Sequence, residues 1–138
     1  MATVLAAGVF DLIHPGHVCY LEEAKKLGDW LVVIVSRDKQ VEKDKGRVII
    51  PEGQRLEVVK SLKPVDEAVL GSETDRFSLV EEIRPDFIAL GPTQSIDEEW
   101  LKQELAKRGV RTMIVRIKKR KECKLCASSK IVERIRNL

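Results

Sequence analysis

The stretch TVLAAGVFDLIHPGH, residues 3–17, contains the features that decide the fold. Residues 3–10 form a short and almost continuous apolar run, which is typical of a strand buried on both faces of a parallel sheet. Pro15 suits the first position of a helix, and the residue before a proline is held in an extended conformation. We therefore expect a strand that runs through a short loop into a helix, with His14 at the helix entrance and His17 in its first turn.

The same alternation of apolar and amphipathic segments continues along the chain. Four more apolar segments predict strands, at residues 30–36, 67–71, 86–91 and 110–117. Amphipathic segments predict helices, at residues 17–28, 51–62, 74–85, 97–109 and 128–136. Thr74 is a candidate N-cap, and the charged segment 37–50 has no clean period and is expected to be a linker. This order predicts an α/β fold: a single Rossmann-like, doubly wound domain over residues 1–138, with about five parallel strands and helices on both faces.

The composition fits one globular domain. The chain has 138 residues, of which 43% are hydrophobic and 34% charged, which is enough for one complete core. The net charge of +3 is too small to indicate nucleic-acid binding, so no nucleic-acid partner is expected. Six basic residues nevertheless gather in RIKKRKECK, residues 116–124, and such a local patch attracts phosphate groups of any kind.

The expected location is the cytoplasm. No apolar run approaches the roughly 20 residues of a membrane span, and the N-terminus lacks the basic start and cleavage site of a signal peptide. No membrane partner is therefore expected. The three cysteines, Cys19, Cys123 and Cys126, are odd in number and do not indicate a disulfide framework, which favours a reducing compartment.

The first strand-to-helix loop predicts an anion site. It carries neither G-x-G-x-x-G nor G-K-[ST], so a dinucleotide-dependent redox enzyme and a P-loop kinase are not expected. Gly16 lets a ligand approach the backbone, and the free amides of a first helical turn favour negative charge. Because the same helix end disfavours protonation of an imidazole, His14 and His17 are expected to be neutral hydrogen-bond donors beside a bound phosphate.

Two other interpretations of these histidines stay open on the residues alone. With Asp11, or with Cys123 and Cys126, they would supply enough ligands for zinc. They would also serve as ordinary capping or packing residues. Their positions on either side of a helix entrance, instead of at i and i+4 within a helix, favour phosphate over metal.

The sequence GVFDLIHPGH, residues 8–17, resembles the signature G-[TS]-F-D-x-x-H-x-G-H of the cytidylyltransferase-like nucleotidyltransferases. The resemblance extends over nearly the whole chain. It includes AKKLGDWLVVIVSRD at residues 24–38, IIPEGQRLEVVKSLKPVDEAVLG at 49–71, LGPTQ at 90–94 and SSKIVERI at 128–135. Within this family the small archaeal FAD synthetases are the most similar, and glycerol-3-phosphate cytidylyltransferases share the first half.

The resemblance implies a nucleotidyltransferase in which a phosphate oxygen of the acceptor attacks the α-phosphorus of a nucleoside triphosphate. His14 and His17 would be the catalytic residues, donating to the phosphoryl oxygens. The expected nucleotide-binding residues are Val9, Phe10, His14, Pro15, Gly16, His17, Thr93, Ser128 and Ser129. The expected phosphate- or acceptor-binding residues are Asp11, Lys43, Lys45 and Arg55. Mg²⁺ is expected as the cofactor, bound mainly through the nucleotide phosphates and without protein ligands.

The substrates implied are ATP and FMN, with transfer of AMP to give FAD and pyrophosphate. One alternative is a CTP-dependent cytidylyltransferase acting on glycerol 3-phosphate or another small phosphate. Another is a non-catalytic nucleotide- or RNA-binding module that uses residues 116–124. A homodimer is common among relatives and is retained as an expectation.

Two positions depart from the family pattern, and the cysteines need a separate interpretation. Val9 replaces the usual Thr or Ser of the signature, and Thr93 stands where related sequences often have Asp. The pair Cys123-x-x-Cys126 is expected to be either a thiol-dependent loop beside the site or two inert thiols. Cys19 is expected in the core.

Overall fold

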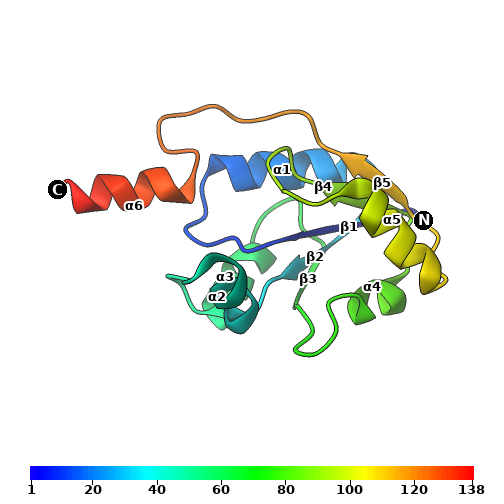
Figure 1. The fold of residues 1–138 in the computed structure, drawn as a ribbon. Helices are drawn as coiled ribbons and strands as arrows, with labels where there is room; N and C mark the ends of the chain where they lie inside the picture. The colour runs from blue at the N-terminus through cyan, green and yellow to red at the C-terminus, as the bar shows by residue number, and fades with distance from the viewer.

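The computed structural model describes residues 1–138 as one parallel sheet flanked by helices (Figure 1). The strands are β1 (Thr3–Gly8), β2 (Trp30–Val35), β3 (Glu67–Leu70), β4 (Phe87–Leu90) and β5 (Met113–Arg116). The helices are α1 (Pro15–Lys25), α2 (Asp38–Lys45), α3 (Glu52–Lys60), α4 (Ser78–Ile83), α5 (Glu98–Lys107) and α6 (Ser128–Arg136). The strand order is β3-β2-β1-β4-β5 and every pairing is parallel, so the predicted Rossmann-like α/β fold is confirmed.

The central strand β1 is buried on both faces, as its apolar run predicts. Val4 and Ala6 belong to a core shared with α1 and α3, and Leu5, between them, belongs to a second core shared with α4 and α5. The alternation follows from the two-residue period of a strand. Figure 1 shows α1 and α4 on opposite sides of the sheet. Two separate apolar cores therefore hold the sheet between its helices.

Two details of the sequence-based prediction are wrong. The expected linker 37–50 contains helix α2, and the helix expected from Thr74 begins at Ser78. The first amide of α2, that of Asp38, donates to the carboxylate of Glu52 on another helix, so its start cannot be read from the local sequence. Thr74 does not cap α4, because Asp75 turns the chain by accepting a hydrogen bond from the amide of Phe77.

The last helix, α6, is confirmed where the sequence predicts it, but it does not pack against the body of the protein. It projects away from the sheet in Figure 1, and none of its residues is buried. Its first residue is joined to the loop after β1, because the hydroxyl of Ser128 donates to the carbonyl of Asp11. No helix in the structure combines the length and the apolar character that crossing a membrane requires.

The packing predicts a large difference between two leucines. Leu21 of α1 is 0% exposed, and Leu138 is 97% exposed. Leu21→Ala should lower the free energy of unfolding by about 2 to 5 kcal/mol, because it removes buried methyl groups and leaves a cavity. Leu138→Ala should change it by less than about 0.5 kcal/mol. Urea denaturation of both variants measures the difference, and equal values would contradict the assigned core.

Candidate active site at the start of the first helix

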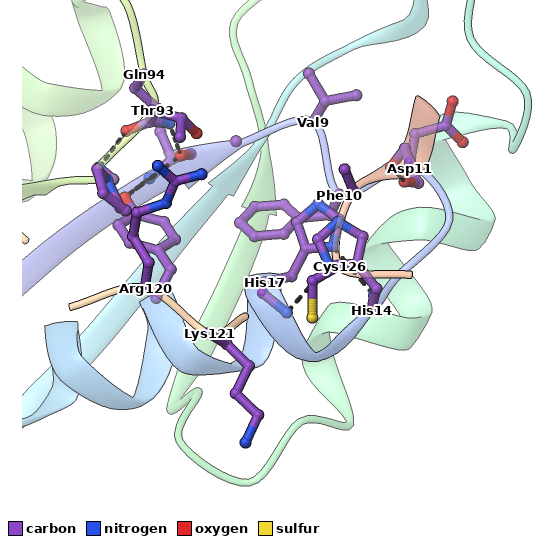
Figure 2. A pocket seen from close by; sticks show the side chains of 18 of the residues that line it. Val9, Phe10, Asp11, His14, His17, Thr93, Gln94, Arg120, Lys121 and Cys126 are labelled. Atoms are coloured by element: carbon purple, nitrogen blue, oxygen red, sulfur yellow. Dashed lines mark hydrogen bonds between the residues drawn. The ribbon is translucent and has the colours of Figure 1, made fainter. Parts of the chain in front are cut away.

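A pocket lies at the carboxyl ends of β1 and β4, where the chain order of the sheet reverses. Its volume is about 500 Å³. Its walls are the loop after β1, the start of α1, the end of α2 with the residues that follow it, the loop after β4 and the segment between β5 and α6. Figure 2 shows His14 and His17 together beside Cys126, with Thr93 and Gln94 at the other end of the pocket.

His14 and His17 form a reciprocal cap on α1. His14 is the extended N-cap residue, with φ −141°, and its Nδ1 accepts a hydrogen bond of 3.0 Å from the amide of Gly16. Nδ1 of His17 accepts one of 3.2 Å from the amide of His14. Both Nδ1 atoms are therefore acceptors, which places the proton of each neutral imidazole on Nε2. Each ring keeps an Nε2–H donor that no group of the protein uses.

The environment keeps both imidazoles neutral. Burial, followed by the nearby charges of His14 and Lys45, lowers the pKa of His17 to about 4, with Asp11 acting weakly in the opposite direction. Burial also lowers the pKa of His14. The ring centroids are 3.9 Å apart, a separation that two positive rings would oppose. At neutral pH the site thus presents two neutral donors, as the sequence predicts.

Gly16 is required by this cap. A Cβ atom added there would lie 2.7 Å from Cε1 of His14 and 2.9 Å from its Nδ1. Any side chain at this position would push the His14 ring off the helix end. The sequence predicts that Gly16 leaves room for a ligand. The missing side chain also leaves the room that the His14 ring occupies.

The loop between β1 and α1 has a strained backbone. Phe10 has φ 57° and Leu12 has φ 54°, values in the left-handed region that side chains disfavour. Phe10 is buried, and its ring centroid lies 5.5 Å from that of His17. This conformation places the buried Phe10 ring beside His17. The ring thereby supports the histidine pair from the side of the core.

The buried side chain of Arg55 holds this loop in place through hydrogen bonds to backbone carbonyls. Its side chain is 1% exposed, and its guanidinium donates to the carbonyls of Val9 and Ser36, at the ends of β1 and β2. It also donates to the carbonyl of Ile50 and to the carboxylate of Asp38. The structure therefore contradicts the expectation that Arg55 binds the acceptor phosphate, since its donors are committed within the protein.

Asp11 lies in the pocket wall, but its carboxylate is also committed. Its two oxygens accept hydrogen bonds of 2.8 and 2.9 Å from the amides of Ile49 and Ile50. It ties the loop after β1 to the segment before α3. Asp11 thus positions the loop, and a negative carboxylate in this arrangement does not bind phosphate directly.

The other predicted residues divide into two groups. Those that line the pocket are Val9, Phe10, Gly16, Lys45, Thr93 and Ser128. Those that do not line it are Pro15, Lys43 and Ser129. Pro15 acts as the first residue of α1, and the side chains of Lys43 and Ser129 are exposed outside the pocket.

Several pocket residues escape prediction from the sequence. Gln94 accepts from the amide of Gly91 and donates to the carbonyl of Ala7, and so joins the ends of β4 and β1. Arg116 fixes the same turn by donating to the carbonyls of Gly91, Gln94 and Ile96. Two stretches give a signal in the sequence. LGPTQ, residues 90–94, contains Gln94, and three residues of the basic run 116–124 line the pocket: Lys119, Arg120 and Lys121.

Cys123 and Cys126 form a disulfide, and Cys19 is free. The expectation of a chain without disulfides is therefore wrong for this pair. Two cysteines three residues apart close a small loop, which a count of cysteines does not reveal. Cys126 lines the pocket beside His14. The cytoplasmic location inferred from the cysteines stays a prediction.

The fold and the pocket define a class of protein: a Rossmann-like domain whose first helix begins at a pocket suited to an anion, with two neutral imidazoles as donors. The family described as Cytidylyltransferase-like matches residues 5–134, and the chain belongs to this family. The resemblance noted for residues 8–17 is thereby confirmed, and with it the class of enzyme, a nucleotidyltransferase.

Relatives cover nearly the whole chain. A protein of Ferroglobus placidus named FAD synthase is 60% identical over 98% of this chain and 88% of its own length. One of Archaeoglobus fulgidus with the same name is 52% identical over 95% of both chains. Among solved structures, the lipopolysaccharide core biosynthesis protein of Thermoplasma volcanium superposes with a TM-score of 0.85 at 44% identity, covering 88% of this chain and 99% of that one.

The low pKa of His17 predicts a dependence of stability on pH. The unfolded chain, in which the pKa returns to about 6.5, binds a proton between pH 6.5 and about 4, and the folded protein does not. The contribution of His17 to the free energy of unfolding should therefore be fully present above pH 6.5 and be lost as the pH drops toward 4. The loss should be on the order of 2 kcal/mol after allowance for solvent screening.

The matched control is His17→Asn, which keeps a side-chain acceptor for the amide of His14 and does not titrate. Denaturation of both proteins across this pH range isolates the contribution of His17 from that of the carboxylates. A loss between pH 6.5 and 4 that is equal in the two proteins would contradict the assignment.

Proposed function

We propose that the protein is an FAD synthase that transfers AMP from ATP to FMN and releases pyrophosphate. The observation that carries the proposal is the pair of unused Nε2–H donors at the start of α1, in a pocket lined by basic side chains. The names of relatives 50–60% identical over nearly the full chain support ATP and FMN as the substrates.

The reaction needs electrostatic stabilisation more than proton transfer. A phosphate oxygen of FMN forms a bond to the α-phosphorus of ATP, and the bond from that phosphorus to the bridging oxygen breaks, so that its electron pair leaves with pyrophosphate. The attacking phosphate is already an anion, and no general base is required. Negative charge grows on the α-phosphoryl oxygens and the leaving group, which is where preorganised donors lower the barrier.

The two histidines suit this role because they are neutral. A neutral imidazole donates through Nε2–H without giving up its proton to an anionic phosphate. Removing one such preorganised donor typically lowers kcat on the order of 100- to 1,000-fold. The five basic side chains around the pocket would balance the charge of the triphosphate and the pyrophosphate: Lys45, Arg47, Lys119, Arg120 and Lys121.

Mg²⁺ would enter with the nucleotide. No group of three or more His, Cys, Asp or Glu side chains is arranged to hold a metal ion. The one carboxylate in the pocket wall, that of Asp11, is committed to two backbone amides. These residues do not fit a protein-bound metal, so the proposal places Mg²⁺ on phosphate oxygens and water. A cytoplasmic location and a homodimer remain predictions alongside it.

The substrates are tested by pyrophosphate release with four pairs: ATP or CTP as nucleotide, and FMN or glycerol 3-phosphate as acceptor. The proposal predicts turnover with ATP and FMN, and FAD as the product identified by mass. Turnover only with CTP would replace the proposal with a cytidylyltransferase. Absence of turnover with any pair, together with salt-sensitive binding of RNA, would favour the non-catalytic alternative.

A further inference from the structure

A second cavity lies on the opposite face of the sheet from α1. It has a volume of about 200 Å³ and lies between the ends of β1, β2 and β4 on one side and helices α4 and α5 on the other. Its deep wall consists of buried apolar side chains: Leu5, Phe77, Val80, Ile88, Leu90 and Leu101. An apolar pocket with a few polar groups at its mouth has the composition typical of small-molecule binding sites.

The mouth of this cavity is polar and carries both hydrogen-bonding and charged groups. Ser36, Gln40 and Ser72 supply hydroxyl and amide groups there. Arg37, which also lines the cavity, is paired with Glu73 at 3.3 Å and donates to the carbonyl of Gly71. A second arginine, Arg76, also lines the cavity. The mouth therefore offers donors and acceptors to the polar edge of a ligand whose apolar part contacts the deep wall.

The wall formed by the 71–77 loop is held firmly in place. Arg108 of the segment after α5 contacts the carboxylate of Asp75 at 2.7 Å, and its guanidinium lies 5.1 Å from the ring centroid of Phe77. The same arginine lowers the pKa of Asp75. The cavity is thus a preformed space, which reduces the cost of ordering when a ligand binds.

The two cavities are neighbours at the same edge of the sheet. They share Ala7, at the end of β1, and Gln94, whose side chain joins Ala7 to Gly91. One cavity is lined by basic groups and the imidazole donors, and the other is mainly apolar. A ligand with a phosphate at one end and an apolar ring system at the other would match both.

We propose that the second cavity binds the isoalloxazine ring of the acceptor, with the ribityl chain passing Gln94 toward the first pocket. This inference rests on the proposed function and deepens it. The dimethylbenzene edge of the ring would contact the apolar wall, and the carbonyl and N–H groups of its pyrimidine edge would face Ser36, Gln40 and Ser72. A volume of 200 Å³ accommodates a ring system but not a whole nucleotide, and the inference assigns ATP, with its triphosphate, to the basic first pocket.

Isoleucine methyl groups report directly on this cavity. Ile34, Ile88 and Ile96 line it, and no isoleucine lines the first pocket. The probe is lumiflavin, which has the isoalloxazine ring but neither ribityl chain nor phosphate. Titration into methyl-labelled protein should shift these three signals and leave Ile114 and Ile135, which are outside the cavity, unchanged. The shifts should persist when ATP is added, because the two ligands occupy different cavities.

Three outcomes overturn the inference: no shift of the three methyl groups while FMN is converted to FAD, loss of the shifts on addition of ATP, or the same shifts with adenosine. Absence of FAD formation from ATP and FMN instead overturns the proposed function. The titration and the turnover assay are separate measurements, so the two failures can be told apart.

A matched pair of substitutions gives a second readout. Ile34→Phe adds volume inside the cavity, whereas Ile114→Phe adds it to a residue packed on the same core outside the cavity. Ile34→Phe should raise KM for FMN on the order of tenfold and leave KM for ATP within about twofold. Ile114→Phe should leave both constants near those of the parent protein. Equal effects of the two variants, or a parallel rise in KM for ATP, would contradict the inference.

Discussion

The hydrogen bonds that His14 and His17 accept from the start of α1 determine what the site can do. Each bond uses Nδ1 of an imidazole to satisfy an amide that an isolated helix leaves without a partner. Each also fixes the tautomer, because a nitrogen that accepts carries no proton. The structural requirement of a helix start and the chemical requirement of a donor are therefore met by the same two rings. An ordinary Ser or Asp cap would complete the helix but provide no donor toward a phosphate.

The rest of the site keeps this arrangement in place. Arg55 and Asp11 join the loop after β1 to the end of β2 and to the segment before α3. Removing a buried, fully bonded guanidinium would leave several carbonyls without partners, a costly change in a protein interior. The left-handed conformations of Phe10 and Leu12 persist because these contacts over-determine the loop. Strain in this loop is thus the cost of placing two imidazoles beside one helix end.

The sequence was informative where the determinants are local. Pro15 and Gly16 define the helix entrance, and the apolar runs define strands, because both depend on neighbouring residues. It was uninformative where the interacting partner is distant in the sequence. The first amide of α2 donates to a carboxylate of α3, and the guanidinium of Arg55 donates to carbonyls from three separate segments. The residues that neighbour an arginine in the sequence do not show whether its side chain binds phosphate or holds a loop in place. The second cavity is likewise invisible in the sequence, since its walls come from three strands, three helices and the loops between them.

The central claim is that both imidazoles are neutral donors through Nε2. Two-bond proton–nitrogen NMR of the protein labelled with ¹⁵N-histidine tests it directly, because the chain has two histidines and both lie in the site. At pH 7 the account predicts that each ring is neutral, with its proton on Nε2 and an unprotonated Nδ1. A proton on Nδ1 of either ring, or the nitrogen shifts of an imidazolium, would contradict it.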